Sequence, residues 1–262
     1  MIKQNNNSKL NSKKAKTSKQ SPAKNEKKIR GYVYTDIMTK FVYIKPASSL
    51  YSLKLLRECV RGKITQEGEK IFDAIANKNA DKYNLQTTDI DYPYVVFLAG
   101  TNILKEITDD VKLLKAIKEE GAKLKPHPLT SPFTMSFLKA KYGKDSLVNK
   151  NLSGHEILNR AKVVGCTTNS EMGLIALAQG KRVNLFDRPK IACKTYTHIY
   201  KVLFEQGYPV INDFKRLLSA TNSGLIYHAS EQPKENIKNF FHYFNKVEHV
   251  KPNRPKSLNT RK

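Results

Sequence analysis

The sequence has few features of a membrane or secreted protein. It contains no run of 18 apolar residues, and its lysine-containing N-terminus has no apolar signal-peptide segment, so we expect neither a transmembrane helix nor a signal peptide. Tryptophan is absent, and the three cysteines, Cys59, Cys166 and Cys193, share no metal-ligand spacing. We therefore expect free thiols and a reducing, cytoplasmic compartment.

Motifs of several enzyme classes are also missing. The chain has no Gly-x-Gly-x-x-Gly fingerprint, no P-loop and no Gly-x-Ser-x-Gly elbow. Its six histidines are scattered, and no carboxylate pair has the spacing of metal ligands, so we predict no metal site. Classical dinucleotide-binding, P-loop and α/β-hydrolase functions are therefore disfavoured.

Acidic residues are scarce: 23 Asp and Glu stand against 47 Lys and Arg, which gives a net charge of +24. Residues 1–30 hold ten Lys or Arg and one Glu, and residues 246–262 hold six and one, which leaves about +10 on the body between them. With few apolar side chains to bury, residues 1–30 are expected to be a disordered basic tail, and 246–262 a basic C-terminal tail. Such tails bind a polyanion such as DNA or an anionic lipid surface, or they are simply solvated.

The body divides into two predicted parts. Residues 31–92 predict a small N-terminal α/β subdomain, with strands at 31–34 and 41–44, a polar turn at 36–40, helices at 50–60 and 67–77, and loop at 78–92. Residues 93–245 predict strands at 94–99, 122–125, 147–148, 162–168, 182–186 and 224–228, with helices at 107–120, 131–142, from 153, 170–179, 195–206, 211–220 and 234–244. This alternation predicts an α/β fold with a Rossmann-like parallel sheet and right-handed crossovers.

His127 follows one of the predicted strands and lies between two prolines. Phosphorylated ligands bind at the carboxyl ends of the strands in an open α/β sheet. The ring at this position can donate a hydrogen bond to a phosphate oxygen, and as imidazolium it adds positive charge. The alternative is a surface histidine in a rigid turn.

A second polar turn, Thr167-Thr168-Asn169-Ser170-Glu171, ends the next buried strand and opens a helix. Helix starts present unpaired amides to an anion, so Thr168, Asn169 and Ser170 are candidate phosphate ligands, and Glu171 is a candidate for ribose hydroxyls. The same residue types also cap ordinary helices. A third turn at Gly100, Thr101 and Asn102 follows the first strand of this region and is a further candidate for the same cleft.

The two polar turns carry a resemblance to a known family. The run Leu124-Lys125-Pro126-His127-Pro128, the later Val163-Val164-Gly165-Cys166-Thr167-Thr168-Asn169-Ser170, and then Gly173, Ala176 and Gly180-Lys181-Arg182-Val183 resemble the C-terminal lobe of GT-B glycosyltransferases. The closest groups are the capsular-polysaccharide families of the Kdo-transferase and polysialyltransferase-like type, which carry an His-Pro motif. The resemblance spans Tyr94 to about Phe204. Where the family often has a Glu in the small-residue helix, this chain has Ile175.

The resemblance implies a donor lobe in which His127, Thr168, Asn169 and Ser170 hold the phosphate and ribose of a nucleotide sugar. It implies a glycosyltransferase, and no metal is required if these groups stabilise the charge of the leaving phosphate. Residues 31–92 are too few for a complete first lobe, so the acceptor lobe is reduced, missing, or supplied by a homodimer or a partner subunit. Asp36 is the carboxylate nominated there as catalytic base, with an ordinary turn aspartate as the alternative.

The charge of the chain suggests the acceptor. A basic body with two basic tails fits a polyanion, and we favour hydroxymethylated DNA over a capsular or surface polysaccharide. The alternative from another class is a non-catalytic nucleic-acid-binding protein on a degenerate transferase fold.

Overall fold

The computed structural model describes residues 31–36, 41–46, 48–77, 85–189, 195–205, 207 and 210–248, and side chains in all of these except 31–36 and 245–248. The predicted N-terminal tail, nearly all of the C-terminal tail, most of the turn at 36–40 and Cys193 lie outside these residues. Predictions for them stay predictions. No helix in the described part of the chain combines the length and the hydropathy needed to cross a bilayer.

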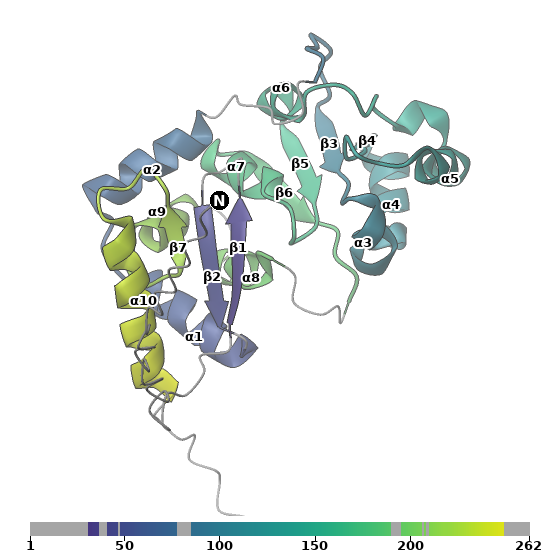
Figure 1. Cartoon of the computed structure of the whole chain (residues 1–262). Helices are drawn as coiled ribbons and strands as arrows, with labels where there is room; N and C mark the ends of the chain where they lie inside the picture. Colours follow the sequence, from purple (N-terminus) through teal and green to yellow (C-terminus); the bar gives the residue numbers. More distant parts are fainter. Residues whose placement is uncertain are drawn as a thin grey trace, which may run out of the picture. The chain divides into compact units, whose positions relative to one another are not determined.

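Four parallel strands form the larger sheet, in the order β4-β3-β5-β6 (Figure 1). They are β3 (Tyr94–Phe97), β4 (Lys123–Lys125), β5 (Val163–Cys166) and β6 (Arg182–Leu185). Val95 pairs with Lys123 on one side of β3 and with Val164 on the other. Helices separate successive strands, so the α/β fold class with a Rossmann-like parallel sheet is confirmed.

Strands β3 and β5 are covered on both faces, which explains their unbroken apolar sequences. Val95, Val96 and Val164 are each at most 1% exposed. Strand β4 ends at Lys125 because the following residue, Pro126, has no amide hydrogen to continue the ladder. Since the strands are parallel, their carboxyl ends lie along one edge of the sheet, and the loops with the predicted site residues start there.

Three antiparallel strands form the second sheet, in the order β1-β2-β7 (Figure 1). They are β1 (Gly31–Asp36), β2 (Phe41–Pro46) and β7 (Leu225–Tyr227). The sequence predicted residues 224–228 as one more strand of the parallel sheet, and this prediction is wrong. The strand pairs with β2 instead, next to a segment about 180 residues earlier in the chain.

Gly224 explains how β7 reaches β2. Its φ is +80°, and its carbonyl accepts a hydrogen bond from the amide of Ile44 at 2.9 Å. A Cβ atom at this position would lie 2.2 Å from the carbonyl oxygen of Ile44, so only glycine fits here. The second sheet thus joins the N-terminal segment to the C-terminal part, and the division into domains near residue 93 stays a prediction.

Ten α-helices and one 3₁₀ turn lie in the described residues. They are α1 (Ser49–Cys59), α2 (Gln66–Ala76), α3 (Thr101–Ile107), α4 (Asp110–Glu120), α5 (Pro132–Tyr142), the 3₁₀ turn Lys144–Ser146, α6 (Gly154–Arg160), α7 (Met172–Ala178), α8 (Thr197–Leu203), α9 (Ile211–Ser219) and α10 (Pro233–Glu248). Gly121 ends α4 at a φ of +67°, as the sequence predicted. Ser153 caps α6 by accepting the amide of Glu156, as predicted, but the carboxylate of Glu156 binds the amide of Thr88 instead of closing the capping box.

Helix α3 is the main element that the sequence did not predict. Residues 101–107 follow the expected turn at Gly100 and form two helical turns that bury Leu104 and Ile107. The helix predicted from residue 107 begins at Asp110, because the side chain of Asp109 accepts the amides of the first turn. The strand predicted at 147–148 is reduced to one isolated bridge between Leu124 and Leu147.

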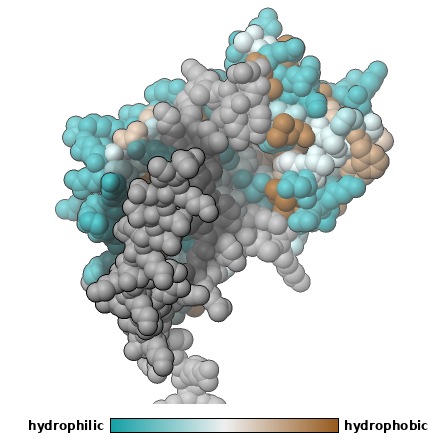
Figure 2. All heavy atoms as spheres, in the orientation of Figure 1, coloured by the Kyte–Doolittle hydropathy of each residue, from teal (hydrophilic) through white to brown (hydrophobic). Residues whose placement is uncertain are grey.

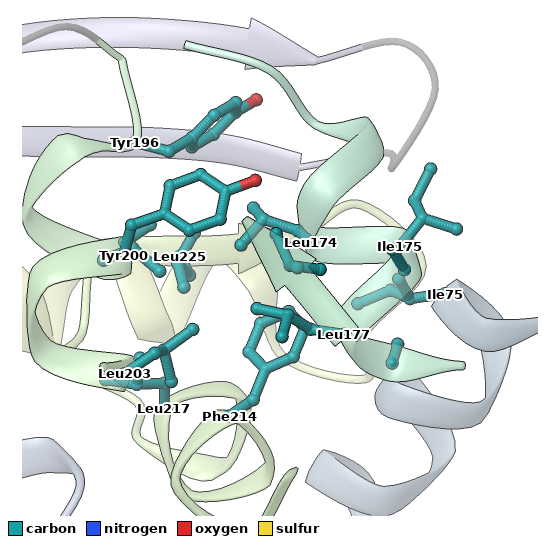
Figure 3. Packing of buried hydrophobic residues seen from close by; sticks show 14 of the residues in the cluster. Ile75, Leu174, Ile175, Leu177, Tyr196, Tyr200, Leu203, Phe214, Leu217 and Leu225 are labelled. Atoms are coloured by element: carbon teal, nitrogen blue, oxygen red, sulfur yellow. The ribbon is translucent and has the colours of Figure 1, made fainter. Parts of the chain in front are cut away.

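Two hydrophobic clusters hold these elements together. The smaller one packs β3 and β4 against α3, α4 and α5. The larger one joins the second sheet, α1 and α2 to β5, α7, α8 and α9. Figure 3 shows side chains of α7, α8 and α9 facing one another in this cluster, among them Leu174, Tyr200 and Phe214. Each large apolar side chain buried in this way contributes about 1.5–3 kcal/mol.

Candidate functional site

Loops that follow β3, β4 and β5 line one cavity of about 340 Å³. The predicted site residues in its walls are Gly100, Asn102, His127, Asn169, Ser170 and Glu171. The two polar turns of the sequence therefore meet at the carboxyl edge of the parallel sheet. The ligand that the cavity takes stays a prediction.

His127 is half-buried in the loop that leaves β4. Its Nδ1 accepts a hydrogen bond from the amide of Leu129 at 3.2 Å, and its carbonyl accepts the amide of Thr130 at 2.9 Å. With Nδ1 as acceptor, the neutral ring carries its proton on Nε2. The turn thus fixes the tautomer that can donate from Nε2 to an oxygen of a ligand.

Lys125 is a cavity residue that the sequence reasoning missed. It is the last residue of β4, only 3% exposed, and its Nζ donates to the carbonyls of Pro126 at 3.1 Å and Lys150 at 2.9 Å. A lysine inside an otherwise buried strand was the signal in the sequence, since lysine is rarely buried. It adds a positive charge to the wall beside His127.

His155 is a second missed residue in the cavity wall. It is the second residue of α6 and only 2% exposed. The sequence predicted a helix start at Ser153 and so placed His155 in the first turn of that helix, but it gave no further sign of a site.

The turn that precedes α7 differs from the prediction in how its amides are used. The amide of Ser170 donates to the carbonyl of Thr167 at 2.9 Å, and the hydroxyl of Ser170 accepts the amide of Met172 at 3.3 Å. Two of the amides that we expected to face a phosphate are therefore engaged within the turn. Helix α7 has seven residues, so its dipole adds little. Asn169, Ser170 and Glu171 still line the cavity with their side chains or backbone.

Thr168 holds the turn in place through bonds within the protein, and its predicted contact with a phosphate stays a prediction. Its amide donates to both carboxylate oxygens of Asp187 at 3.1 Å, and its hydroxyl donates to Oδ1 of Asp187 at 2.8 Å. The hydroxyl also lies 2.9 Å from Oγ1 of Thr197 in α8. Thr168 is only 5% exposed, so these contacts use its polar atoms inside the protein.

Asp187 follows β6 and was not among the predicted residues. Burial raises the pKa of its carboxyl, although the hydrogen bonds from Thr168 act in the opposite direction. A carboxylate placed directly after a strand was the available signal. Helix α8 and the residue before it support the same turn. The hydroxyl of Tyr200 donates to the carbonyl of Ser170 at 2.8 Å, and the amide of Tyr196 donates to the carbonyl of Thr168 at 3.0 Å.

The other two predicted residues lie on separate elements. Thr101 is the exposed first residue of α3, and its hydroxyl accepts the amide of Ser131 at 3.2 Å, which joins the starts of α3 and α5. Asp36 ends β1, opposite Phe41 in the antiparallel sheet, and its side chain is outside the described part. Its assignment as catalytic base stays a prediction.

The cysteines that the structure describes are free thiols, as predicted. Cys59 and Cys166 are buried, and burial raises the pKa of each thiol to about 12. Both are therefore protonated and unreactive at neutral pH. Within the described ranges, His, Cys, Asp and Glu side chains form no group of three or more with the geometry of a metal site.

No protein-family model matches the chain, and no curated protein matches its sequence. A solved structure that it resembles is Thermosulfurimonas dismutans KpsC, beta Kdo 2,7 transferase, with a TM-score of 0.45 and 17% identity. The match covers 78% of this chain and 72% of that chain. At this TM-score and identity the likeness carries no conclusion, and the fold class rests on the topology of the sheet.

Proposed function

We propose that the protein is a nucleotide-sugar-dependent glycosyltransferase whose donor phosphate binds in the cavity of about 340 Å³. The observation that carries the proposal is the meeting of three strand-end loops, represented by Gly100, His127 and Ser170, in one cavity at the carboxyl edge of a parallel sheet. Phosphorylated ligands bind at this edge in open α/β folds. The volume lies in the range of small-molecule sites, roughly 300–1,000 Å³.

The charges around the cavity suit a leaving phosphate. In the proposed step, an acceptor hydroxyl oxygen bonds to the anomeric carbon, and the bond from that carbon to the donor phosphate oxygen breaks. The electron pair leaves with the phosphate, and the hydroxyl proton passes to a base, for which Asp36 remains the candidate. The Nε2–H of His127 and the buried charge of Lys125 stabilise the negative charge as it develops.

Glu171 and Asn169 are the residues proposed for the sugar of the nucleotide. Both are half-buried and line the cavity next to Ser170. A carboxylate accepts hydrogen bonds from ribose hydroxyls, and an amide both donates and accepts. Loss of either is expected to weaken nucleotide binding, and loss of Asn169 also removes the acceptor of the buried Thr167 hydroxyl.

The proposed acceptor is a polyanion, because the net charge of +24 favours one. Hydroxymethylated DNA and an anionic polysaccharide are the two acceptors to compare, each incubated with protein and nucleotide sugar and analysed by mass spectrometry for an added hexose or acidic sugar. A protein that binds DNA tightly, with no nucleotide binding and no transfer, would instead support the non-catalytic nucleic-acid-binding alternative.

Nucleotide binding tests the proposal directly. UDP, CMP and GDP are titrated separately into the full chain by calorimetry, and one of them is expected to bind saturably. In His127→Ala the affinity should fall about tenfold or more, since a hydrogen bond to a charged phosphate is lost. Transfer should slow by roughly 2.7–4 kcal/mol in the barrier, the usual cost of one donor to a developing anion.

The matched control is His228→Ala, which removes an exposed histidine at the end of β7. This variant should bind nucleotide like the wild type. If no nucleotide binds, or if both variants bind equally well, the cavity is not the donor site.

A further inference from the structure

A second cavity of about 220 Å³ lies among α3, α4 and α5. Its inner walls are apolar and come mainly from Leu104, Leu113 and Leu138, which are at most 5% exposed. The ring of Phe137 and the side chain of Leu98 complete them. Figure 2 shows hydrophobic and hydrophilic residues mixed at the surface over the part of the chain that carries these helices. The predicted glycosyltransferase site uses none of these walls except Leu98.

Positive charge predominates at the rim of this cavity. Lys105, Lys141 and Arg188 line it together with one carboxylate, Asp110. The carboxylate of Asp110 already has protein partners. Its Oδ2 lies 2.6 Å from Nζ of Lys141 and 3.5 Å from Nη2 of Arg188, and its Oδ1 accepts the hydroxyl of Tyr142 at 2.5 Å. Although burial acts to raise it, the pKa of Asp110 is lowered by these contacts, so the carboxylate stays ionised and occupied.

Lys105 differs from the other two cations of the rim, Lys141 and Arg188, which lie within 4 Å of the Asp110 carboxylate. Among the described contacts its ammonium lies over the ring of Phe137, 4.5 Å from the centroid. The ammonium of Lys141 lies 5.4 Å from the centroid of the same ring. Cation–π contacts of this kind hold both charges at the edge of an apolar surface.

The hydroxyl of Thr108 provides an independent sign of a ligand. Thr108 lines the cavity and is 3% exposed, and its Oγ1 is buried with no hydrogen-bond partner among the described residues. A buried hydroxyl without a partner costs free energy, so such groups in native proteins are normally bonded to protein, water or ligand. Oγ1 itself has almost no accessible surface, so an acceptor atom in the cavity would satisfy it after a small rotation of the Thr108 side chain.

The wall around Thr108 is held rigidly before any ligand binds. Its carbonyl accepts Nε of Arg188 at 2.8 Å, and Thr108 forms an antiparallel bridge with Asp187. The amide of Arg188 also donates to the carbonyl of Ile107 at 2.8 Å. These bonds fix the guanidinium beside the cavity, which lowers the ordering cost of binding an anion.

We propose that this second cavity binds a small organic carboxylate with an apolar body about the size of one ring. The carboxylate accepts hydrogen bonds from the Thr108 hydroxyl and lies against Lys105 and Arg188, and the apolar body packs on Leu104, Leu113 and Leu138. A cavity of about 150 Å³ lined by apolar side chains holds a benzene molecule, so 220 Å³ accommodates a ring with one carboxyl group. The three leucine side chains in the walls favour an acid with an apolar body over inorganic phosphate.

Binding of benzoate to the full chain tests this proposal. Titration followed by ligand-observed NMR is expected to give saturable binding with a dissociation constant of about 1 mM, as usual for a ligand of this size. The neutral analogue benzamide should bind at least about tenfold more weakly, because it has no charge to place at the rim. Inorganic phosphate should not displace benzoate.

Two variants test whether benzoate binds beside Thr108 and Lys105. Thr108→Val keeps the shape and removes the hydroxyl, and Lys105→Gln removes one exposed charge; each should weaken benzoate binding about three- to tenfold. Lys118→Gln, an exposed lysine in the last turn of α4, is the matched control and should bind normally. His127→Ala should also bind benzoate normally, which separates this site from the donor site.

Three results would overturn the proposal. They are the absence of saturable benzoate binding, equal binding of benzamide and benzoate, and full affinity in both Thr108→Val and Lys105→Gln. Melting temperatures of the variants, measured alongside, show whether a weakened affinity comes from unfolding. A variant that melts like the wild type and binds weakly supports the site.

Discussion

Replacement of Asp187 by alanine and by asparagine separates the effect of its hydrogen bonds to Thr168 from the effect of its negative charge. The side chain accepts the amide of Thr168 at 3.1 Å and its hydroxyl at 2.8 Å. In Asp187→Ala both acceptors are lost. The hydroxyl keeps a partner at Thr197, 2.9 Å away, but the buried amide does not. An unsatisfied buried donor costs about 1–3 kcal/mol, so the free energy of unfolding should fall by that amount.

Asp187→Asn should cost much less. The amide oxygen of asparagine still accepts the Thr168 amide, and its NH₂ group donates to the Thr168 hydroxyl, which in turn donates to Thr197. The substitution also removes a buried charge, and the raised pKa of Asp187 shows that burial outweighs the hydrogen bonds that favour this charge. We expect the free energy of unfolding at pH 7 to change by less than about 1 kcal/mol.

The pH dependence has a definite sign. The folded pKa of Asp187 is raised, so the folded state favours the protonated form, and this contribution is present at low pH and lost as pH rises through the folded pKa. The wild type should therefore gain stability relative to Asp187→Asn as the pH falls from 7 towards 4.

Urea unfolding followed by far-ultraviolet circular dichroism measures the stability of both Asp187 variants at pH 7 and the pH dependence of the difference between the wild type and Asp187→Asn. Asp145→Ala, at an exposed carboxylate in the 3₁₀ turn, is the matched control and should change stability by less than about 0.5 kcal/mol. The reasoning fails if the asparagine variant is as unstable as the alanine variant, because the loss would then come from the charge and not from the orphaned amide.

Two further predictions concern packing and acid stability. In Gly173→Ala the new Cβ would lie 2.3 Å from the hydroxyl of Tyr200 and 2.5 Å from the sulfur of Cys166. The free energy of unfolding, measured with urea, should therefore fall by about 1–3 kcal/mol. The control Gly154→Ala, whose new Cβ has no contact closer than 3.4 Å, should be nearly neutral. Burial, together with nearby lysines, lowers the pKa of His198 to about 4, so stability should be lost as pH falls from about 6.5 towards 4, by roughly 1–3 kcal/mol. His198→Asn should flatten this part of the pH curve, and an unchanged slope would show that other groups cause it.

The parts of the fold that the sequence predicted depend on short stretches of chain. The apolar run of β3, the stop at Gly121 and the cap at Ser153 each follow from neighbouring residues. The place of β7 does not, because a three-residue strand is compatible with either sheet. Its position depends on the close approach of Gly224 to Ile44, two residues far apart in the sequence.

The candidate site, like the fold, could be predicted only where neighbouring residues decide the structure. That the loops at His127 and Ser170 meet follows from parallel strands, whose carboxyl ends share an edge. Which atoms of the second loop face the cavity does not follow, because Asp187 and α8 bind Thr168 from outside the local sequence. The helix-start pattern alone therefore predicted a phosphate contact for an amide that the protein itself uses.

Neighbouring residues of one turn thus have opposite parts in the proposed site. Thr168 directs its amide and hydroxyl to Asp187, whereas Asn169 and Glu171 line the cavity. A residue that holds the turn must change stability and nucleotide affinity together when it is replaced, since the cavity wall moves with it. A residue that only lines the cavity changes affinity and leaves the free energy of unfolding nearly constant. If Glu171→Gln lowered stability as much as Thr168→Val, this division would be wrong, and the turn would be a structural element with no binding surface of its own.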